Sequence, residues 1–136
     1  MDALELRDAT VVGVGFGAWV AAAVAIKSTA RMSHLVLANA VGIKVGDRET
    51  RDIVDIFALL DPEFNKLAYC DPKAGERDYK TMPEAEVVAI ARNREALARF
   101  GWQPYMHDPK LKSRLHRIRI PTLFPSKASI VSTRSI

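Results

Sequence analysis

Three glycines stand at alternate positions, Gly13, Gly15 and Gly17, between a β-branched run and a long apolar stretch. This order is typical of a buried strand that passes through a tight turn into a helix, with Gly15 at the centre of the turn. The first backbone amides of such a helix can bind a phosphate or stabilise an oxyanion. Gly15 has no side chain, and its neighbours Val14 and Phe16 are apolar. The turn therefore supplies no group that can attack a substrate.

The other residues that could do chemistry are few and scattered. His34 precedes a predicted strand, and His107 and His116 flank a predicted helix, so we interpret all three as surface or packing residues. Cys70 is the single cysteine and has no cysteine or histidine neighbour at metal-ligand spacing, which indicates an idle thiol. The sequence predicts neither a metal site nor a cofactor.

The composition is that of an ordinary globular domain. The 136 residues are 49% hydrophobic and 26% charged, which argues against a disordered or fibrous chain and predicts one domain. The longest apolar run, residues 17–26, is too short to cross a bilayer, and the N-terminal residues lack the pattern of a secretory leader. These features predict a soluble cytoplasmic protein that does not associate with membranes.

Charge is distributed unevenly along the chain. All 16 acidic residues lie at or before Asp108, whereas seven of the 20 lysines and arginines follow it. A basic segment of this kind is one signature of a surface for nucleic acid or anionic membrane. No nucleic-acid motif is present, and no aromatic residue interleaves with the charges beyond Phe124. We therefore prefer a solvated helix face followed by an irregular basic tail.

The hydrophobic pattern predicts a strand, a helix and a second strand near the N-terminus. Residues 10–14 form a β-branched run bounded by glycine, and residues 35–38 form another apolar run. Between them, residues 18–27 are apolar on nearly every face, so we expect this helix to be covered on all sides. Residues 1–40 are thus predicted to form a core βαβ unit with two parallel strands.

Charged helices are predicted to dominate the middle of the chain. Residues 48–60 carry apolar side chains at helical spacing, and Pro62 is expected to end that helix. A second helix is predicted to start at a capping box formed by Thr81 and Glu84 and to end near Phe100.

The remaining residues are predicted to return to the sheet. Asp108-Pro109 is a typical start for a short helix, and residues 118–124 form an apolar run that indicates a strand. We assign residues 41–110 as a helical cap-like insertion. Residues 111–136 then comprise the return helix, a core strand and the irregular basic tail.

Three stretches resemble the α/β-hydrolase family, in the order that the family shows. Residues 4–22, with the glycine turn and the apolar helix behind it, resemble the strand, nucleophile elbow and elbow helix of the family, written Gly-x-Ser-x-Gly. Residues 35–40, Leu-Val-Leu-Ala-Asn-Ala, are similar to the next core strand, and residues 111–124 to the segment that re-enters the sheet after a helical cap. The resemblance implies a partial α/β-hydrolase core, with a few parallel strands and the elbow helix, plus the cap. A complete capped hydrolase needs roughly 250 residues, so we expect this core to be incomplete.

The resemblance also implies where the chemistry would take place. Gly13 and Gly17 match the elbow glycines, Gly15 the nucleophile, and the backbone amide of Phe16 one half of the oxyanion hole. Capped members cleave ester, epoxide or carbon–carbon bonds of small molecules, with a nucleophile, a histidine and an acid acting together. The last predicted strand is followed by neither an acid nor a histidine. The sequence therefore predicts a hydrolase-like chain that lacks an intact triad and is inactive as it stands.

Two other interpretations remain open. Gly13-x-Gly15-x-x-Ala18 also fits the Gly-x-Gly-x-x-Gly/Ala fingerprint of a dinucleotide-binding βαβ unit, whose glycines admit a pyrophosphate. Against it, Asn39 stands where an acid should bind the ribose, and a helical stretch follows instead of a further βα unit. The third interpretation is a non-catalytic interaction protein. An exposed sheet edge would also favour self-association.

Overall fold

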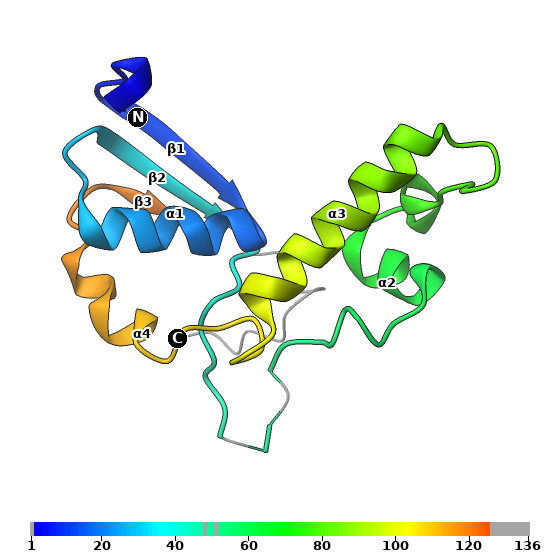
Figure 1. Cartoon of the computed structure of the whole chain (residues 1–136). Coiled ribbons are helices and arrows are strands. Elements are labelled where there is room, and N and C mark those ends of the chain that lie inside the picture. Colours follow the sequence, from blue (N-terminus) through cyan, green and yellow to red (C-terminus); the bar gives the residue numbers. More distant parts are fainter. Residues whose placement is uncertain (1, 48, 51, 126–136) are drawn as a thin grey trace. The chain divides into compact units, whose positions relative to one another are not determined.

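A computed structural model describes residues 2–47, 49–50 and 52–125 of the chain (Figure 1). From position 126 onward, the predicted irregular basic tail lies outside the described residues. The chain divides into two compact units, Met1–Ile53 with Met106–Ile136, and Val54–Tyr105. We call the first the sheet unit and the second the helical unit.

The sheet unit is built on parallel strands, which the described residues arrange in the order β1-β2-β3 (Figure 1). A 3₁₀ turn, η1 (Asp2–Leu4), precedes strand β1 (Ala9–Val14), which leads into helix α1 (Phe16–Lys27). Strand β2 (Met32–Ala38) follows and pairs with β1. The α/β class and the first two predicted strands are confirmed.

Strand β3 (Thr122–Leu123) is shorter than the strand predicted for residues 118–124. Pro121 has no amide proton, so only its carbonyl joins the ladder, where it accepts a hydrogen bond from the Leu35 amide at 3.0 Å. Ile118 is the C-terminal cap of the preceding 3₁₀ turn and is not part of the strand. The prediction placed the strand correctly but was wrong about its length.

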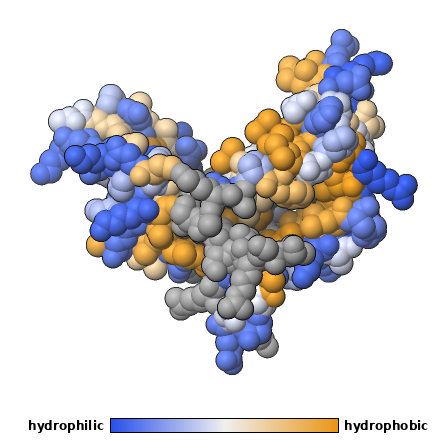
Figure 2. Space-filling model, turned by 180° about the vertical axis from the view of Figure 1, so that it is seen from behind, coloured by the Kyte–Doolittle hydropathy of each residue, from blue (hydrophilic) through white to orange (hydrophobic). Residues whose placement is uncertain are grey.

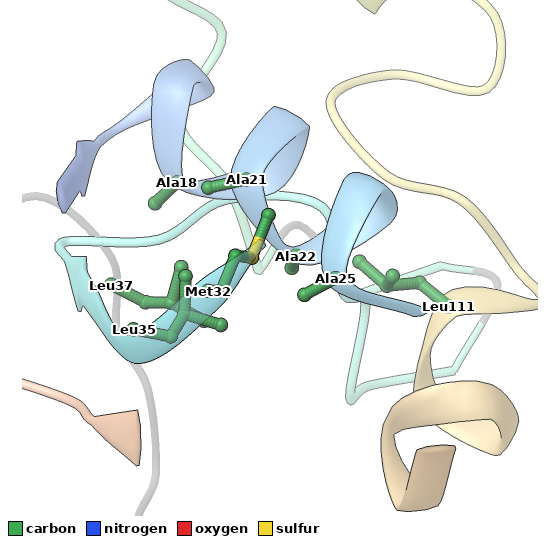
Figure 3. Packing of buried hydrophobic residues seen from close by; sticks show 8 residues of the cluster. All are labelled: Ala18, Ala21, Ala22, Ala25, Met32, Leu35, Leu37 and Leu111. Atoms are coloured by element: carbon green, nitrogen blue, oxygen red, sulfur yellow. The ribbon is translucent and has the colours of Figure 1, made fainter. Parts of the chain in front are cut away.

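Helix α1 covers one face of the sheet through a stripe of alanines (Figure 3). The small side chains let the helix approach β2 closely, and they pack against larger apolar residues of that strand. Val20 and Val24 lie outside this stripe and are exposed. The expectation of a helix covered on all sides is therefore wrong, because only the alanine stripe meets the sheet. The buried cluster comprises Ala18, Ala21, Ala22, Ala25, Met32, Leu35, Leu37 and Leu111.

The other face of the sheet is left uncovered by the described residues. The strand register places Val12, Val14 and Leu123 on this face, and they are 63%, 64% and 62% exposed. Figure 2 shows apolar surface on this side of the sheet unit. Parallel sheets ordinarily carry helices on both faces, so this face is unusual for its class. Strand β1 also forms one edge of the described sheet.

A bridge inside the sheet unit joins the segments that precede and follow the helical unit. Gly42 bridges His107 in parallel fashion. The Gly42 amide donates to the Met106 carbonyl, and the Asp108 amide donates to the Gly42 carbonyl, both at 2.9 Å. These bonds hold the two segments side by side.

The return segment consists of helix α4 (Leu111–Arg114) and the 3₁₀ turn η3 (Leu115–Arg117). The helix predicted to start at Asp108-Pro109 therefore begins later, at Leu111. Its α-helical part ends at Arg114, and a 3₁₀ turn follows. A carboxylate oxygen of Asp108 accepts from the Lys110 amide at 2.8 Å, which makes a separate turn before α4.

The helical unit contains helix α2 (Asp61–Ala68), the 3₁₀ turn η2 (Pro72–Gly75) and helix α3 (Glu84–Gly101). Helix α2 packs against η2, with the side chain of Asn65 buried next to Gly75. A Cβ on Gly75 would clash with the side-chain oxygen of Asn65, so the two elements approach closely at this glycine.

The helix predicted for residues 48–60 is wrong for the described part of that range. A carboxylate oxygen of Asp47 accepts hydrogen bonds from the amides of Glu49 and Thr50, at 3.0 and 2.7 Å. Such local bonds between side chain and backbone compete with helix formation. Pro62 lies in the first turn of α2, where proline fits, and does not end an earlier helix.

Helix α3 ends close to the predicted position but starts without the predicted capping box. Pro83 occupies the N-cap position, and no side chain caps the helix. The Thr81 hydroxyl donates instead to the Asp78 carbonyl at 3.4 Å. Because Met82 and Pro83 stand between Thr81 and the helix start, the threonine is two positions too early to act as the cap. Glu84 and Glu86 in the first turn still complement the helix dipole.

Candidate functional site

Gly15 joins β1 to α1 with a backbone conformation that other residues rarely adopt. Its φ of 55° and ψ of −118° match the first central residue of a type II′ turn, where glycine is preferred. Its amide donates to the Ala38 carbonyl at 2.9 Å, and its carbonyl accepts from the Ala18 amide at 3.1 Å. The turn is thus held by β2 on one side and by the first turn of α1 on the other.

The three glycines of the turn differ in whether the structure requires glycine at their positions. A Cβ on Gly13 would lie 2.6 Å from both the Ala18 Cα and the Gly17 carbonyl oxygen, so the strand and the helix touch there. Gly15 has space for a side chain, since beyond its two chain neighbours no atom lies within 4 Å of its Cβ position, but its positive φ favours glycine. Gly17 has neither constraint. Only Gly13 and Gly15 are therefore required by the geometry.

Backbone amides are available at the start of α1. The first amides of any helix have no carbonyl partner within the helix. In α1 the Ala18 and Trp19 amides bond to the Gly15 carbonyl, whereas no described residue accepts from the amides of Phe16 or Gly17. The first turn holds no acidic residue, and no side chain caps the helix. This helix start can therefore bind an anion or a polarised carbonyl oxygen.

Aromatic packing supports the turn from the helix side. The rings of Phe16 and Trp19 meet edge to face with their centroids 5.4 Å apart. Trp19 in turn lies against Gly42, where a Cβ would fall 2.6 Å from the indole Cγ. Gly42 also has a φ of 109°, so both its conformation and this contact favour glycine. Trp19 thus fixes the segment after β2 against α1.

The carboxyl ends of parallel strands meet at one edge of a sheet, where α/β proteins bind their ligands. Gly15 and then Phe16 follow β1 at this edge, Asn39 follows β2, and Phe124 follows β3. The Asn39 amide donates to the Pro125 carbonyl at 3.3 Å, which extends the pairing of β2 beyond β3. The residues that directly follow the described strands thus include no carboxylate, imidazole, hydroxyl or thiol. They could orient a ligand but could not take part in proton transfer or nucleophilic attack.

The histidines lie at separate positions of the sheet unit. His34 is exposed within β2, opposite Thr10 of β1. His107 is half-buried in the bridge to Gly42, and His116 lies in η3 with its Nδ1 2.8 Å from the Ser113 carbonyl oxygen. None of the three directly follows a strand.

The described residues contain no metal-binding group. Within them, no three His, Cys, Asp or Glu side chains come together in a way that could hold an ion. Cys70 is exposed in the helical unit. The same residues contain no helix that is both long and apolar enough to span a bilayer.

The helical unit contains a polar contact that no sequence pattern predicted. The Tyr105 hydroxyl donates to the Val54 carbonyl at 3.0 Å and accepts from the Ile56 amide at 2.9 Å. Its ring packs edge to face on Phe57 and Trp102, with centroids 6.5 and 6.3 Å apart. Burial raises the pKa of Tyr105 above 10.0, against an opposing effect of the Ile56 hydrogen bond. No local pattern indicates this contact, because its partners lie 49 and 51 positions away.

The fold and the turn define the class of this protein as α/β, with a glycine turn at the carboxyl edge of a small parallel sheet. Comparisons with known proteins narrow the class no further, since no family model, curated protein or solved structure matches the chain.

Proposed function

We propose that this chain contains part of an α/β-hydrolase core but has no catalytic activity. Its elbow turn binds a small molecule that bears an acid or ester group, without cleaving it. The observation that carries this proposal is the geometry of Gly15. The residue has a sharp strand-to-helix turn with positive φ, and no atom lies within 4 Å of its Cβ position. A nucleophilic side chain would have room at this position, yet the residue has none.

The order of the elements supports the hydrolase-like part of the proposal. The strands are parallel, and they neighbour one another in the order in which they occur along the chain. The helical unit is inserted between β2 and β3, where the resemblance places the cap of a capped hydrolase. The strand order comes from hydrogen-bonded pairing and is therefore independent of the sequence motifs that first suggested the family.

The chemistry of the carboxyl edge supports the non-catalytic part. Hydrolysis through a triad needs a nucleophile, a base and an acid in mutual hydrogen-bonding distance. Gly15, Asn39 and Phe124 cannot fill these roles, and the loss of nucleophile or base alone lowers turnover by about six powers of ten in a triad enzyme. What remains is the pair of amides on Phe16 and Gly17, which can bind an oxygen atom without reacting with it.

Hydrolysis by the full chain and by its Gly15→Ser variant tests the catalytic claim. The substrates are p-nitrophenyl acetate and p-nitrophenyl butyrate, with a fluorophosphonate probe for a reactive serine and an active serine esterase as positive control. We expect wild type and variant to release p-nitrophenol no faster than buffer, because no described residue places a base beside position 15. Circular dichroism checks that the variant is folded. Turnover by wild type that heat abolishes, or turnover by Gly15→Ser, would overturn the claim.

Ligand binding is tested separately by nuclear magnetic resonance of the backbone amides. Acetate and methylphosphonate are titrated into labelled full-length protein, and amides in helix α3 serve as the internal control. We expect the largest shifts at Phe16 and Gly17, since their amides have no acceptor among the described residues. Uniform small shifts across the chain would contradict the ligand-binding part of the proposal.

A second candidate function is dinucleotide binding, and one contact favours it. Ala18 is fully buried, and its backbone meets the Cβ position of Gly13, as expected for the third small residue of a Gly-x-Gly-x-x-Gly/Ala fingerprint. Isothermal titration with NAD and FAD separates the two candidates. Saturable binding that Gly15→Ser abolishes, in a folded variant, supports a dinucleotide site; no heat of binding at millimolar cofactor rejects it.

A further inference from the structure

A basic strip lies on the sheet unit in the segment that leads back to β3. Five basic residues occur here within residues 110–119, and all of them are exposed. No acidic residue occurs between them or after them in the sequence. We use the name basic strip for Lys110, Lys112, Arg114, Arg117 and Arg119.

The charges of the basic strip have no ion-pair partner within the described part of the chain. No described residue forms an ion pair or a side-chain hydrogen bond with any of the five basic groups. In the helical unit, two arginines do form ion pairs: Arg99 lies 3.1 Å from Glu95, and Arg94 lies 3.5 Å from Asp61. Like charges within one short segment repel one another, and an anionic partner relieves that repulsion. The strip therefore has its full charge available for a partner.

Apolar residues of the same segment fix the strip in place. Leu111 is buried in the core cluster, and Leu115, Ile118 and Ile120 pack against that cluster. Helix α4 and η3 lie close to α1 (Figure 1), and Figure 3 shows Leu111 next to Ala25. Because the apolar side chains face the core, the charges are displayed outward on a fixed backbone.

We propose that the basic strip binds the phosphate backbone of double-stranded nucleic acid, without reading its base sequence. Phosphate contacts by lysine and arginine supply essentially all of such non-specific affinity. This inference is independent of the proposed function, since the strip lies in α4, η3 and the residues after them and uses no residue of the elbow turn.

Two features favour a nucleic-acid duplex over other polyanions. An amphipathic membrane-binding segment inserts its apolar face into the lipid, but the apolar side chains of this segment are already packed in the core. Proteins that bind single strands stack bases on aromatic rings, and residues 110–119 contain no Phe, Tyr or Trp. Non-specific binding of a duplex requires only cations that can contact its phosphates.

The test measures the salt dependence of binding by fluorescence anisotropy with a labelled DNA duplex of random sequence. The strip variant is Lys112→Gln/Arg114→Gln/Arg117→Gln in the full chain. The matched control is Lys73→Gln/Arg77→Gln/Lys80→Gln, which removes the same charge from exposed positions of the helical unit. All three proteins are titrated at NaCl concentrations from about 50 to about 200 mM, where phosphate contacts give a steep dependence.

We expect wild type and control to bind with the same steep slope of log affinity against log salt. The strip variant should lose up to about 0.9 units of slope for each phosphate contact removed, or about 2.7 for three, and bind at least tenfold more weakly at low salt. Equal affinity and slope for all three proteins, or no binding at the lowest salt, would overturn the proposal. Binding to anionic phospholipid vesicles with no binding to the duplex would overturn it in favour of a membrane surface. Circular dichroism confirms that each variant is folded.

Discussion

The Cα atom of Ala18 lies 2.6 Å from the position that a Cβ atom on Gly13 would occupy. Real Cβ atoms do not approach other heavy atoms so closely, so β1 and α1 can be this near only because position 13 is glycine. The same approach buries Ala18 completely and brings the alanine stripe of α1 onto β2. One missing methyl group thus determines how the helix lies on the sheet.

We therefore predict that Gly13→Ala lowers the free energy of unfolding by about 1–3 kcal/mol, because the methyl group meets backbone atoms that cannot move aside. Urea denaturation followed by circular dichroism measures the change. Gly17→Ala is the matched control two residues away, at a position with open space. It should raise the free energy of unfolding by about 0.4–1 kcal/mol, since alanine restricts the unfolded chain and suits a helix. Equal effects of the two variants would contradict this account of the turn.

Gly15→Ala tests backbone conformation without a steric clash. No atom lies near the Cβ position, but alanine disfavours a φ of 55° with a ψ of −118°. We expect the free energy of unfolding to fall by about 1–3 kcal/mol. The measurement is again urea denaturation, with Gly17→Ala as the reference for a methyl group added to the same turn. A variant as stable as wild type would mean that the turn does not need positive φ at this position.

Removal of the Tyr105 hydroxyl should weaken the helical unit. Tyr105→Phe leaves the Val54 carbonyl and the Ile56 amide without their partner, which we expect to lower the free energy of unfolding by about 1 kcal/mol. The variant keeps the aromatic packing, so near-ultraviolet circular dichroism should remain close to that of wild type. Tyr105→Leu, which removes ring and hydroxyl together, should cost more.

The stability of wild type should also fall at alkaline pH through the same residue. Because burial raises the pKa of Tyr105, the unfolded chain loses this proton before the folded chain does as the pH rises above 10.0. The contribution is fully present below the unfolded pKa and is lost as the pH rises through the folded one. Denaturation at pH 9 and at pH 11 should show a smaller alkaline loss in Tyr105→Phe than in wild type. Identical losses would contradict the raised pKa.

The turn at Asp47 makes a prediction about acid titration. A hydrogen bond from the Thr50 hydroxyl, followed by bonds from the Thr50 and Glu49 amides, lowers the pKa of Asp47 below 3.8. Folding therefore favours the ionised carboxyl, and this preference is lost as the pH falls through the folded pKa. Thr50→Val should raise the pKa of Asp47 toward 3.8 in a carbon-detected titration. Lys44→Gln, which removes a weaker influence, should shift it less; an equal shift would assign the lowering to charge rather than to the hydroxyl.

Short-range patterns were enough to predict the N-terminal half of the sheet unit. The β-branched run before Gly15, the alanine-rich helix and the apolar run of β2 each have a strong local signal, and they form in the predicted order. The prediction for residues 48–60 failed because the hydrogen bonds that the carboxylates of Asp47 and Asp55 accept from nearby amides outweigh apolar spacing. Side-chain bonds of this kind depend on rotamers, which periodicity does not describe.

The candidate site was predictable in part. The spacing of glycines indicated a turn centred on Gly15. It could not show that a close contact requires glycine at position 13, whereas no contact requires it at position 17. That difference depends on how closely the helix approaches the strand. The Tyr105 contact was unpredictable for a similar reason, because its two partners are remote in sequence. The assignment to α/β hydrolases and the self-association through β1 stay predictions.

Tyr105 and Val54 are the last and first residues of the helical unit, and their hydrogen bond joins the two ends of that segment. The polypeptide therefore enters and leaves the helical unit at two neighbouring residues. The entropy of closing a loop between such neighbouring ends changes only slowly with loop length. Evolution or an engineer can accordingly enlarge, trim or exchange the inserted module while the strand register stays as it is.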